Sequence, residues 1–329
     1  MTGARASRAS LAPLAWLALA GLLAQGLALA LGSVALAPGE LLAVLAGDGE
    51  ALHRTLVLEL RLPRALAAFG TGALLALAGA LMQILLRNPL ADPYVLGLSG
   101  GASVAALAAM LAGLATTLVA GAAFAGALAS TLIVFGLAHG GGSWTPTRLL
   151  LTGVVMAAGW GALITFLLAV SPVERLPGML YWLMGDLAYA GSPWPVLAVA
   201  ATGLVVVLPL GRTLNVLARG GLQAAALGVA VRPLEWTLYL LASLVTAVAV
   251  TTAGSVGFVG LMVPHMLRLR LGNDQRVILP ASLLAGGTLL TLADSLARTL
   301  IAPQQLPVGV ITALLGVPTF LYLLHRSRR

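Results

Sequence analysis

The sequence predicts an all-α integral membrane protein, a bundle of ten transmembrane helices with inverted-repeat halves and short cytoplasmic helices. Of the 329 residues, 60% are apolar and only 9% are charged, and the mean hydropathy is +1.03. A soluble domain carries roughly 25% charged residues. The apolar residues also gather in runs that reach the length of about 20 helical residues needed to cross a bilayer. A soluble globular protein is therefore excluded.

Ten apolar runs are predicted as spans. They cover residues 11–36, 65–86, 95–111, 114–137, 149–169, 193–210, 236–253, 260–271, 277–296 and 308–324. Within lipid every backbone polar group must be bonded internally, so only helices or a closed barrel can span the membrane. The runs are longer than barrel strands and lack alternation of polar and apolar residues, which favours helices. The whole chain, 1–329, is predicted to be a single polytopic domain.

The arginines support this topology. With both termini on the cytoplasmic side, all of the 18 basic residues fall on that side except Arg54, Arg61, Arg64, Arg175 and Arg298. This distribution obeys the positive-inside rule. The alternative reading of the first run as a signal peptide is disfavoured, because the apolar part of such a peptide has only about 7–15 residues.

The residue types that are missing exclude several chemistries. The chain has no cysteine and no lysine, since all 18 basic residues are arginine. A phosphate-binding G-x-x-x-x-G-K-[ST] loop needs lysine, and disulfides, thiolate zinc sites and iron–sulfur clusters need cysteine. Neither a nucleophile nor a pair of carboxylates faces a predicted cavity. No catalytic residue, metal ligand or cofactor is therefore predicted in this chain.

Small residues crowd the predicted spans, as in residues 71–80 and 121–129. Glycine, alanine, serine and threonine let helices approach closely in lipid, so a compact bundle is expected. Residues 75–81 (LALAGAL) and 250–256 (VTTAGSV) form a faint internal echo, and each precedes a break that contains proline. Two such breaks in corresponding halves are typical of an inverted-repeat transporter.

Three segments interrupt the apolar pattern with specific polar and proline-rich strings. They are residues 87–102 (RNPLADPYVLGLSGGA), 252–268 (TAGSVGFVGLMVPHMLR) and 306–324 (LPVGVITALLGVPTFLYLL). Proline stops a helix, and irregular backbone at membrane depth is tolerated only where it is buried or lines a cavity. The simpler reading of the first is a turn between helices. His265 is read as an interfacial histidine at a helix break, because no second metal ligand lies four residues away.

Together the three strings resemble the FecCD-type permease subunits of type II ABC importers, which take up ferric siderophores, haem or cobalamin. The resemblance is carried by residues 87–102, 255–268 and 306–324, and it extends over nearly the whole chain. It implies ten spans per subunit and a homodimer around a central path. It also implies two separate ATPase subunits, which bind ATP and Mg²⁺, and a periplasmic substrate-binding protein.

The resemblance implies two candidate gates on the translocation path. Asn88 and Leu90 match family gate positions in the break after the second span. Thr145, Pro146 and Thr147, before the fifth span, form the second candidate, although Pro146 departs from the hydroxyl-rich family pattern. A plain helix cap is the alternative for this second stretch.

Residues 212–235 (RTLNVLARGGLQAAALGVAVRPLE) read as two short amphipathic helices on the cytoplasmic side. The segment looks like the family's coupling helices, which contact the ATPase, with Asn215, Leu217, Gly220 and Leu227 at the centre of the contact. The family's usual acidic pair is replaced by Gly221 and Leu222, which weakens the case for individual salt bridges. The alternative is a surface hairpin of two helices.

Arg61, Arg64 and Arg298 are three external arginines at predicted membrane boundaries. Snorkelling of the guanidinium to water explains any one of them. The matching family positions pair with acidic residues of the binding protein, and the planar guanidinium binds carboxylates in a bidentate manner. Docking of the binding protein is the preferred interpretation.

The predicted function is that of the transmembrane permease subunit of a binding-protein-dependent importer for haem, a ferric siderophore or cobalamin in the bacterial inner membrane. The alternative is an ATP-independent secondary transporter. Such a carrier is expected to place ionisable residues near the middle of the membrane, and the predicted spans contain almost none. Nothing in the sequence distinguishes among the three chelates.

Overall fold

A computed structural model describes residues 3–32, 34, 36–138, 145–188 and 190–326. Within these residues the chain is all-helical, without a strand. The α-helices are α1 Gly3–Ala30, α2 Pro38–Ala46, α3 Ala51–Arg54, α4 Leu62–Leu85, α5 Leu98–Leu111, α6 Thr116–Ala138, α7 Pro146–Ala169, α8 Leu176–Met184, α9 Trp194–Val207, α10 Gly211–Leu217, α11 Gly221–Ala226, α12 Val231–Ala253, α13 Val259–Leu271, α14 Gln275–Thr299 and α15 Val308–Arg326. A π-helical segment, η1 Thr55–Arg61, and two 3₁₀ turns, η2 Pro93–Leu96 and η3 Leu208–Leu210, join some of them.

Helix α4 is the centre of the bundle. It packs against α14, α12, α13 and α9, and nearly all of its residues are buried. The contacts are close because both partners present glycine: a Cβ atom at Gly79 would lie 1.8 Å from the carbonyl oxygen of Gly260 on α13. A Cβ at Gly72 would lie 2.2 Å from the oxygen of Gly286 on α14. Backbone therefore rests on backbone along α4, as expected for small residues in a membrane bundle.

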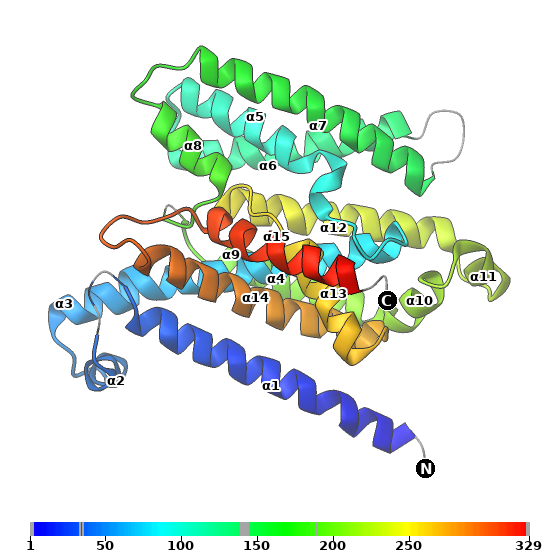
Figure 1. Cartoon of the computed structure of the whole chain (residues 1–329), viewed down its shortest axis with the longest axis horizontal. Helices are drawn as coiled ribbons and strands as arrows, with labels where there is room; N and C mark the ends of the chain where they lie inside the picture. Colours follow the sequence, from blue (N-terminus) through cyan, green and yellow to red (C-terminus); the bar gives the residue numbers. More distant parts are fainter. Residues whose placement is uncertain (1–2, 33, 35, 139–144, 189, 327–329) are drawn as a thin grey trace.

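Helices α5, α6, α7 and α8 form a layer along one side of this body (Figure 1). Within the layer α5 and α6 also meet through glycine, since a Cβ at Gly101 would lie 2.6 Å from the oxygen of Gly126. Helix α7 lies at the outside. Only 11% of its apolar stretch is buried, against 89% in the run that contains α4.

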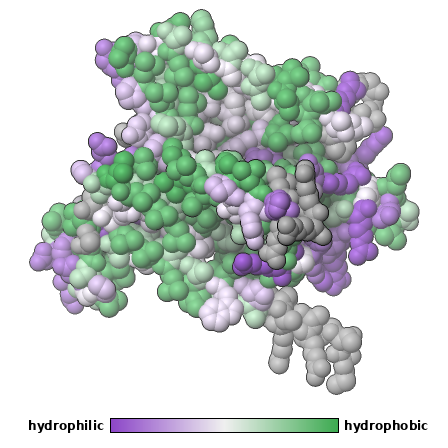
Figure 2. Space-filling view, viewed as in Figure 1, coloured by the Kyte–Doolittle hydropathy of each residue, from purple (hydrophilic) through white to green (hydrophobic). Residues whose placement is uncertain are grey.

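The two ends of the bundle are distinct. Helices α2 and α3 lie at one end and α10 and α11 at the other, which is also the end where α1 begins and α15 finishes (Figure 1). The surface between them is mainly apolar, and strongly hydrophilic side chains gather toward the ends (Figure 2). Within the described part of the chain, seven helices are long and apolar enough to cross a membrane, by length and composition. The chain is thus a multi-pass membrane protein.

Each of the ten predicted spans overlaps a helix, but several bounds differ. Helix α1 ends at Ala30, six residues before the predicted end, and the short helices α2, α3 and α8 were not predicted. Helix continues without a break from Ala51 to Leu85, earlier than the predicted start at residue 65. The π-helical segment ends directly before Leu62 and Pro63, and the Leu62 amide bonds back five residues to the carbonyl of Val57.

The internal echo does not correspond to equivalent local structure. Residues 75–81 lie in the middle of α4, whereas α12 ends at Ala253 and Gly254 turns the chain with φ of 67°. The inverted repeat stays a prediction.

Candidate translocation and coupling sites

The loop between α4 and α5 contains the first candidate gate and is held by short local bonds. The Asn88 side-chain oxygen accepts a hydrogen bond from the Leu90 amide at 2.9 Å, and Asp92 accepts one from the Tyr94 amide at 2.8 Å. Such turns explain why asparagine and aspartate flank the prolines. Asn88 is exposed and Leu90 is half-buried. Burial raises the pKa of Asp92 to about 6, against the opposing effect of the Tyr94 amide.

The three strings that carry the family resemblance meet in space. The Val256 amide donates to the Tyr94 hydroxyl at 3.2 Å, and the Gln83 amide, just before the first string, donates to the carbonyl of Leu261 at 3.0 Å. The third string joins them at Gly309, where a Cβ would lie 3.3 Å from the oxygen of Ser255. The loop between α4 and α5, called the gate loop below after the predicted gate at Asn88 and Leu90, is therefore fixed to the loop between α12 and α13.

The second candidate gate lies at the start of α7. The Thr145 hydroxyl accepts a hydrogen bond from the Arg148 amide at 3.2 Å and caps the helix, as the alternative reading required. Pro146 is the first helical residue, and Thr147 is exposed. Residues 139–144, just before this stretch, lie outside the described residues.

Trp160 connects α7 to the end of the gate loop, a link that the sequence analysis missed. Its indole N–H donates to the Ser130 hydroxyl at 2.9 Å, and this hydroxyl donates to the carbonyl of Gly97 at 2.9 Å. A Cβ at Gly100 would lie 2.6 Å from the Trp160 side chain. The only sequence signal was a tryptophan among small residues, which is also common in a helix that faces lipid.

The predicted coupling segment forms α10 and α11 at one end of the bundle. Asn215 bonds twice to the start of α14: its amide nitrogen donates to Asp274 at 2.9 Å, and its oxygen accepts from the Gln275 amide at 2.8 Å. Arg276 and Asn215 together lower the pKa of Asp274 below its usual range. Asn215 therefore attaches α10 to the bundle.

Leucines in the coupling segment divide into buried and exposed groups. Leu217, predicted at the centre of the ATPase contact, is 1% exposed and packs into the core with Leu214 on the same helical face. This corrects the composition of the predicted surface. Leu222 and Leu227 are 91% and 72% exposed. Gly220 separates the two helices with φ of 136°, a backbone conformation that favours glycine.

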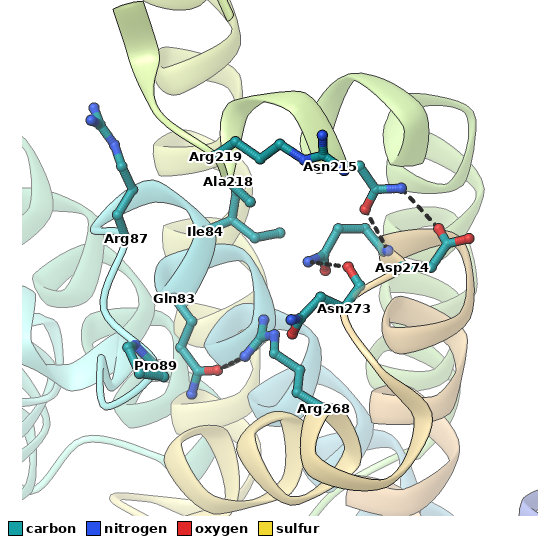
Figure 3. A pocket seen from close by; sticks show the side chains of 11 residues that line it. Gln83, Ile84, Arg87, Pro89, Asn215, Ala218, Arg219, Arg268, Asn273 and Asp274 are labelled. Carbon is teal, nitrogen blue, oxygen red and sulfur yellow. Dashed lines mark hydrogen bonds between the residues drawn. The ribbon is translucent and has the colours of Figure 1, made fainter. Parts of the chain in front are cut away.

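A cavity of about 620 Å³ lies between the gate loop, α10 and the junction of α13 with α14 (Figure 3). It connects the first gate candidate with the coupling segment. Its lining residues are Gln83, Ile84, Arg87, Pro89, Asn215, Ala218, Arg219, Arg268, Asn273, Asp274 and Gln275.

The three arginines predicted to be external lie at the α2–α3 end, where Arg64 and Arg298 contact Asp294. Arg64 binds Asp294 in a bidentate manner, with nitrogen–oxygen distances of 2.8 to 3.1 Å, and donates to Gln305 at 2.8 Å. The Arg298 nitrogen Nε lies 3.1 Å from Asp294 Oδ2, an oxygen that Arg64 also contacts. Asp186, between α8 and α9, lies 3.9 Å from Arg64, and burial raises the pKa of its carboxyl.

Arg61 and Arg298 are buried, and their guanidinium groups bind backbone carbonyls at and just after the end of α1. Arg61 donates to the carbonyls of Leu29, Ala30 and Val34, and Arg298 donates to that of Ala28 at 3.2 Å. A cation that binds the last carbonyls of a helix is stabilising. Neither snorkelling nor docking describes these two side chains in this conformation. Arg64, with 13% of its side chain exposed, is the member nearest to solvent.

A second cavity, of about 900 Å³, lies at the same end between α6, α8, α9 and α12. Trp182, Phe124 and a pair of threonines, Thr251 and Thr252, contribute to its wall. Among the described residues, no group of three histidine or carboxylate side chains is placed to hold a metal ion.

Comparison with known proteins identifies the family. The FecCD transport family matches residues 16–326. The chain belongs to this family. It is 45% identical over 279 residues to the cobalamin import system permease protein BtuC of Halobacterium salinarum, covering 83% of this chain and 74% of the relative. It is 42% identical over 284 residues to the hemin transport system permease protein HmuU of Yersinia pestis, covering 82% and 83%.

A solved structure agrees with the FecCD assignment. A metal-chelate type ABC transporter in an inward-facing conformation superposes with a TM-score of 0.83 at 29% identity, covering 96% of this chain and 99% of that one. The family resemblance predicted from the three strings is thus confirmed.

Proposed function

We propose that this FecCD chain is the permease subunit of a binding-protein-dependent ABC importer that carries haem, a ferric siderophore or cobalamin across the bacterial inner membrane. The observation that carries the proposal is the junction of the three family strings, which joins the gate loop to the cavity beside the coupling segment. Relatives named for cobalamin and hemin support the class of substrate. A separate ATPase, with its own ATP and Mg²⁺, drives the cycle.

The working unit is a homodimer in which α7 lines the shared path. Support comes from the exposure of α7, whose small residues Gly159 and Gly161 have open space where a Cβ would lie. Small residues are what a close helix contact in lipid requires. Both termini and the α10–α11 end face the cytoplasm, as the arginine distribution favours. The topology has ten spans, with α5, α13 and α15 crossing beside the seven longer helices.

Two gates and two docking surfaces complete the proposal. Asn88 and Leu90 close the path toward the cytoplasm, and Thr145 to Thr147 contribute from α7. The exposed leucines Leu222 and Leu227, with Asn215 and Gly220 shaping the segment, contact the ATPase, since packed interface cores are depleted of charge. Arg64 contacts an acidic group of the binding protein, with Arg61 and Arg298 fixing the surface beneath it.

Reconstitution tests the proposal. The permease is placed in liposomes with its ATPase and binding protein, and uptake of haem, a ferric siderophore and cobalamin is measured with and without ATP. Uptake of one chelate that needs ATP and both partners is expected. Uptake by the permease alone would instead favour an ATP-independent secondary transporter.

Topology is tested separately by labelling single cysteines. The chain has no cysteine of its own, so each introduced thiol reports alone. We expect Leu222→Cys to react with a membrane-impermeant reagent only from the cytoplasm and Leu42→Cys, on α2, only from outside. Labelling of both from one side would refute the proposed orientation.

A further inference from the structure

The cavity between the gate loop and α10 has a polar wall in which the side-chain acceptors of Gln83, Asn215 and Asp274 are already used. The side-chain oxygen of Gln83 accepts from Arg268, and the oxygen of Asn215 accepts from the Gln275 amide at 2.8 Å. Asp274, the one carboxylate in the wall, accepts from Asn215 and Arg276. The buried side-chain oxygen of Gln275 has no partner, but it has no accessible surface from which to meet a ligand.

Two arginines of the same wall, Arg219 and Arg268, have no acidic partner among the described side chains. Arg219 is exposed, and neither it nor Arg268 has a carboxylate within ion-pair distance among the residues that the structure describes. Arg268 is half-buried, and its bonds go to two neutral oxygens, those of Gln83 and Ala80. Arg87 differs, because it lies 3.5 Å from Glu235. The wall thus carries two uncompensated guanidinium groups.

These groups enter the cavity from opposite sides. Arg219 extends from the turn between α10 and α11, and Arg268 extends from α13 beside Gln83 (Figure 3). Asn273, between α13 and α14, also lines the space. The charge of the half-buried Arg268 is unfavourable without a counter-charge, and a bound anion removes that cost. Arg219 is exposed and bears no such cost, so its contribution is a second set of donors for the same anion. Planar guanidinium groups bind the oxygens of carboxylates and phosphates in a bidentate manner.

We propose that this cavity is a binding site for a phosphate group. Two guanidinium groups match the two charges of a phosphate monoester or of cardiolipin, whereas one protein carboxylate would leave an arginine uncompensated. The cavity lies where α4 and α13 end and α14 begins, which is the depth of lipid phosphates if these helices span the membrane. Basic pockets between helices on the cytoplasmic side are suited to such headgroups. The orientation, though not the binding, rests on the proposed function.

The test uses the permease assembled with its ATPase in nanodiscs. Binding of radiolabelled inorganic phosphate is measured in phosphatidylcholine discs, and retention of cardiolipin is measured by native mass spectrometry after incorporation at a low mole fraction. The variants are Arg219→Gln, Arg268→Gln and the double change. Arg270→Gln is the matched control, because Arg270 lies exposed on the same helix and does not line the cavity.

We expect wild type and Arg270→Gln to bind alike and each cavity variant to lose about tenfold or more in affinity, as for hydrogen bonds to charged groups. Binding of inorganic phosphate identifies a soluble source, and retention of cardiolipin alone identifies the lipid. The exposed Arg219 keeps the test valid if Arg268→Gln fails to fold.

Three results would overturn the inference. They are absence of both ligands from wild type, equal loss in Arg270→Gln, and binding that appears only when the ATPase is removed, which would show that a partner side chain fills the cavity. ATP-driven uptake is measured on the same preparations. A wild type that transports but binds no phosphate would end this inference and leave the proposed function intact.

Discussion

Replacing Asp294 with asparagine removes the carboxylate that contacts both Arg64 and Arg298. Asp294 is 1% exposed, and its two oxygens lie 2.8 Å and 3.1 Å from the nitrogens of these arginines. Asparagine keeps the shape and loses the charge. Removing one partner of a buried ion pair costs about 3–5 kcal/mol.

The lower end of this range applies here. Arg64 is partly exposed and keeps Asp186 at 3.9 Å, whereas Arg298 loses its ion-pair partner among the described residues. We therefore expect a loss of about 3 kcal/mol in the free energy of unfolding, or roughly a hundredfold in the unfolding equilibrium at 1.36 kcal/mol per decade.

Unfolding is followed by tryptophan fluorescence as sodium dodecyl sulfate is titrated into the purified permease. Asp48→Asn is the control, since Asp48 is exposed and a surface substitution changes stability by about 0.5 kcal/mol or less. A change below about 0.5 kcal/mol in Asp294→Asn would refute the reasoning.

Three further predictions test the proposed sites. Asn88→Ala removes the side-chain oxygen that accepts from the Leu90 amide, and we expect slower ATP-driven uptake or a higher basal leak in proteoliposomes. Asn88→Asp keeps this acceptor and is the control. Unchanged uptake and leak in Asn88→Ala would end the gate assignment. We expect at least a severalfold rise in the ATP hydrolysed per chelate transported in Leu222→Asp and, separately, in Gly220→Trp. The control Leu222→Met should not change this ratio. A normal ratio in both test variants would exclude this surface as the ATPase contact. Arg64→Gln should weaken association of the binding protein about twofold to tenfold and reduce its dependence on salt, as expected for loss of a charged contact. Equal effects from Arg54→Gln, at an exposed arginine outside the cluster, would contradict a specific role for Arg64.

Much of the fold could be predicted because lipid allows few solutions. Apolar length and the arginine distribution placed all ten predicted segments on helices. Span ends were less accessible, since helix continues from Ala51 through a π-helical segment into α4. Apolar periodicity does not distinguish an α-helical from a π-helical register over one or two turns.

Site residues were predictable where the signal was local and not where it depended on distant partners. The turn at Asn88 and the cap at Thr145 follow from residue type and neighbours. Arg61 could not be assigned, because its partners are carbonyls about thirty residues earlier, at the end of α1. Leu217 was misplaced for a similar reason, since an amphipathic helix alone does not show which face meets the bundle.

The glycine contacts along α4 also constrain how the protein moves. Where the oxygen of one backbone occupies the Cβ position of the next, as at Gly79 on Gly260, the helices cannot slide without a clash. The same holds between α5 and α6 at Gly101 and Gly126. We therefore expect α4 to move as one rigid unit with α13 and α14, and α5 to move as another with α6. The joint between them includes side-chain contacts, such as that of the Tyr239 hydroxyl on α12, which donates to the carbonyl of Thr131 on α6. A side chain can change rotamer where a backbone contact cannot yield, so relative movement of the two groups is expected to be concentrated at this joint.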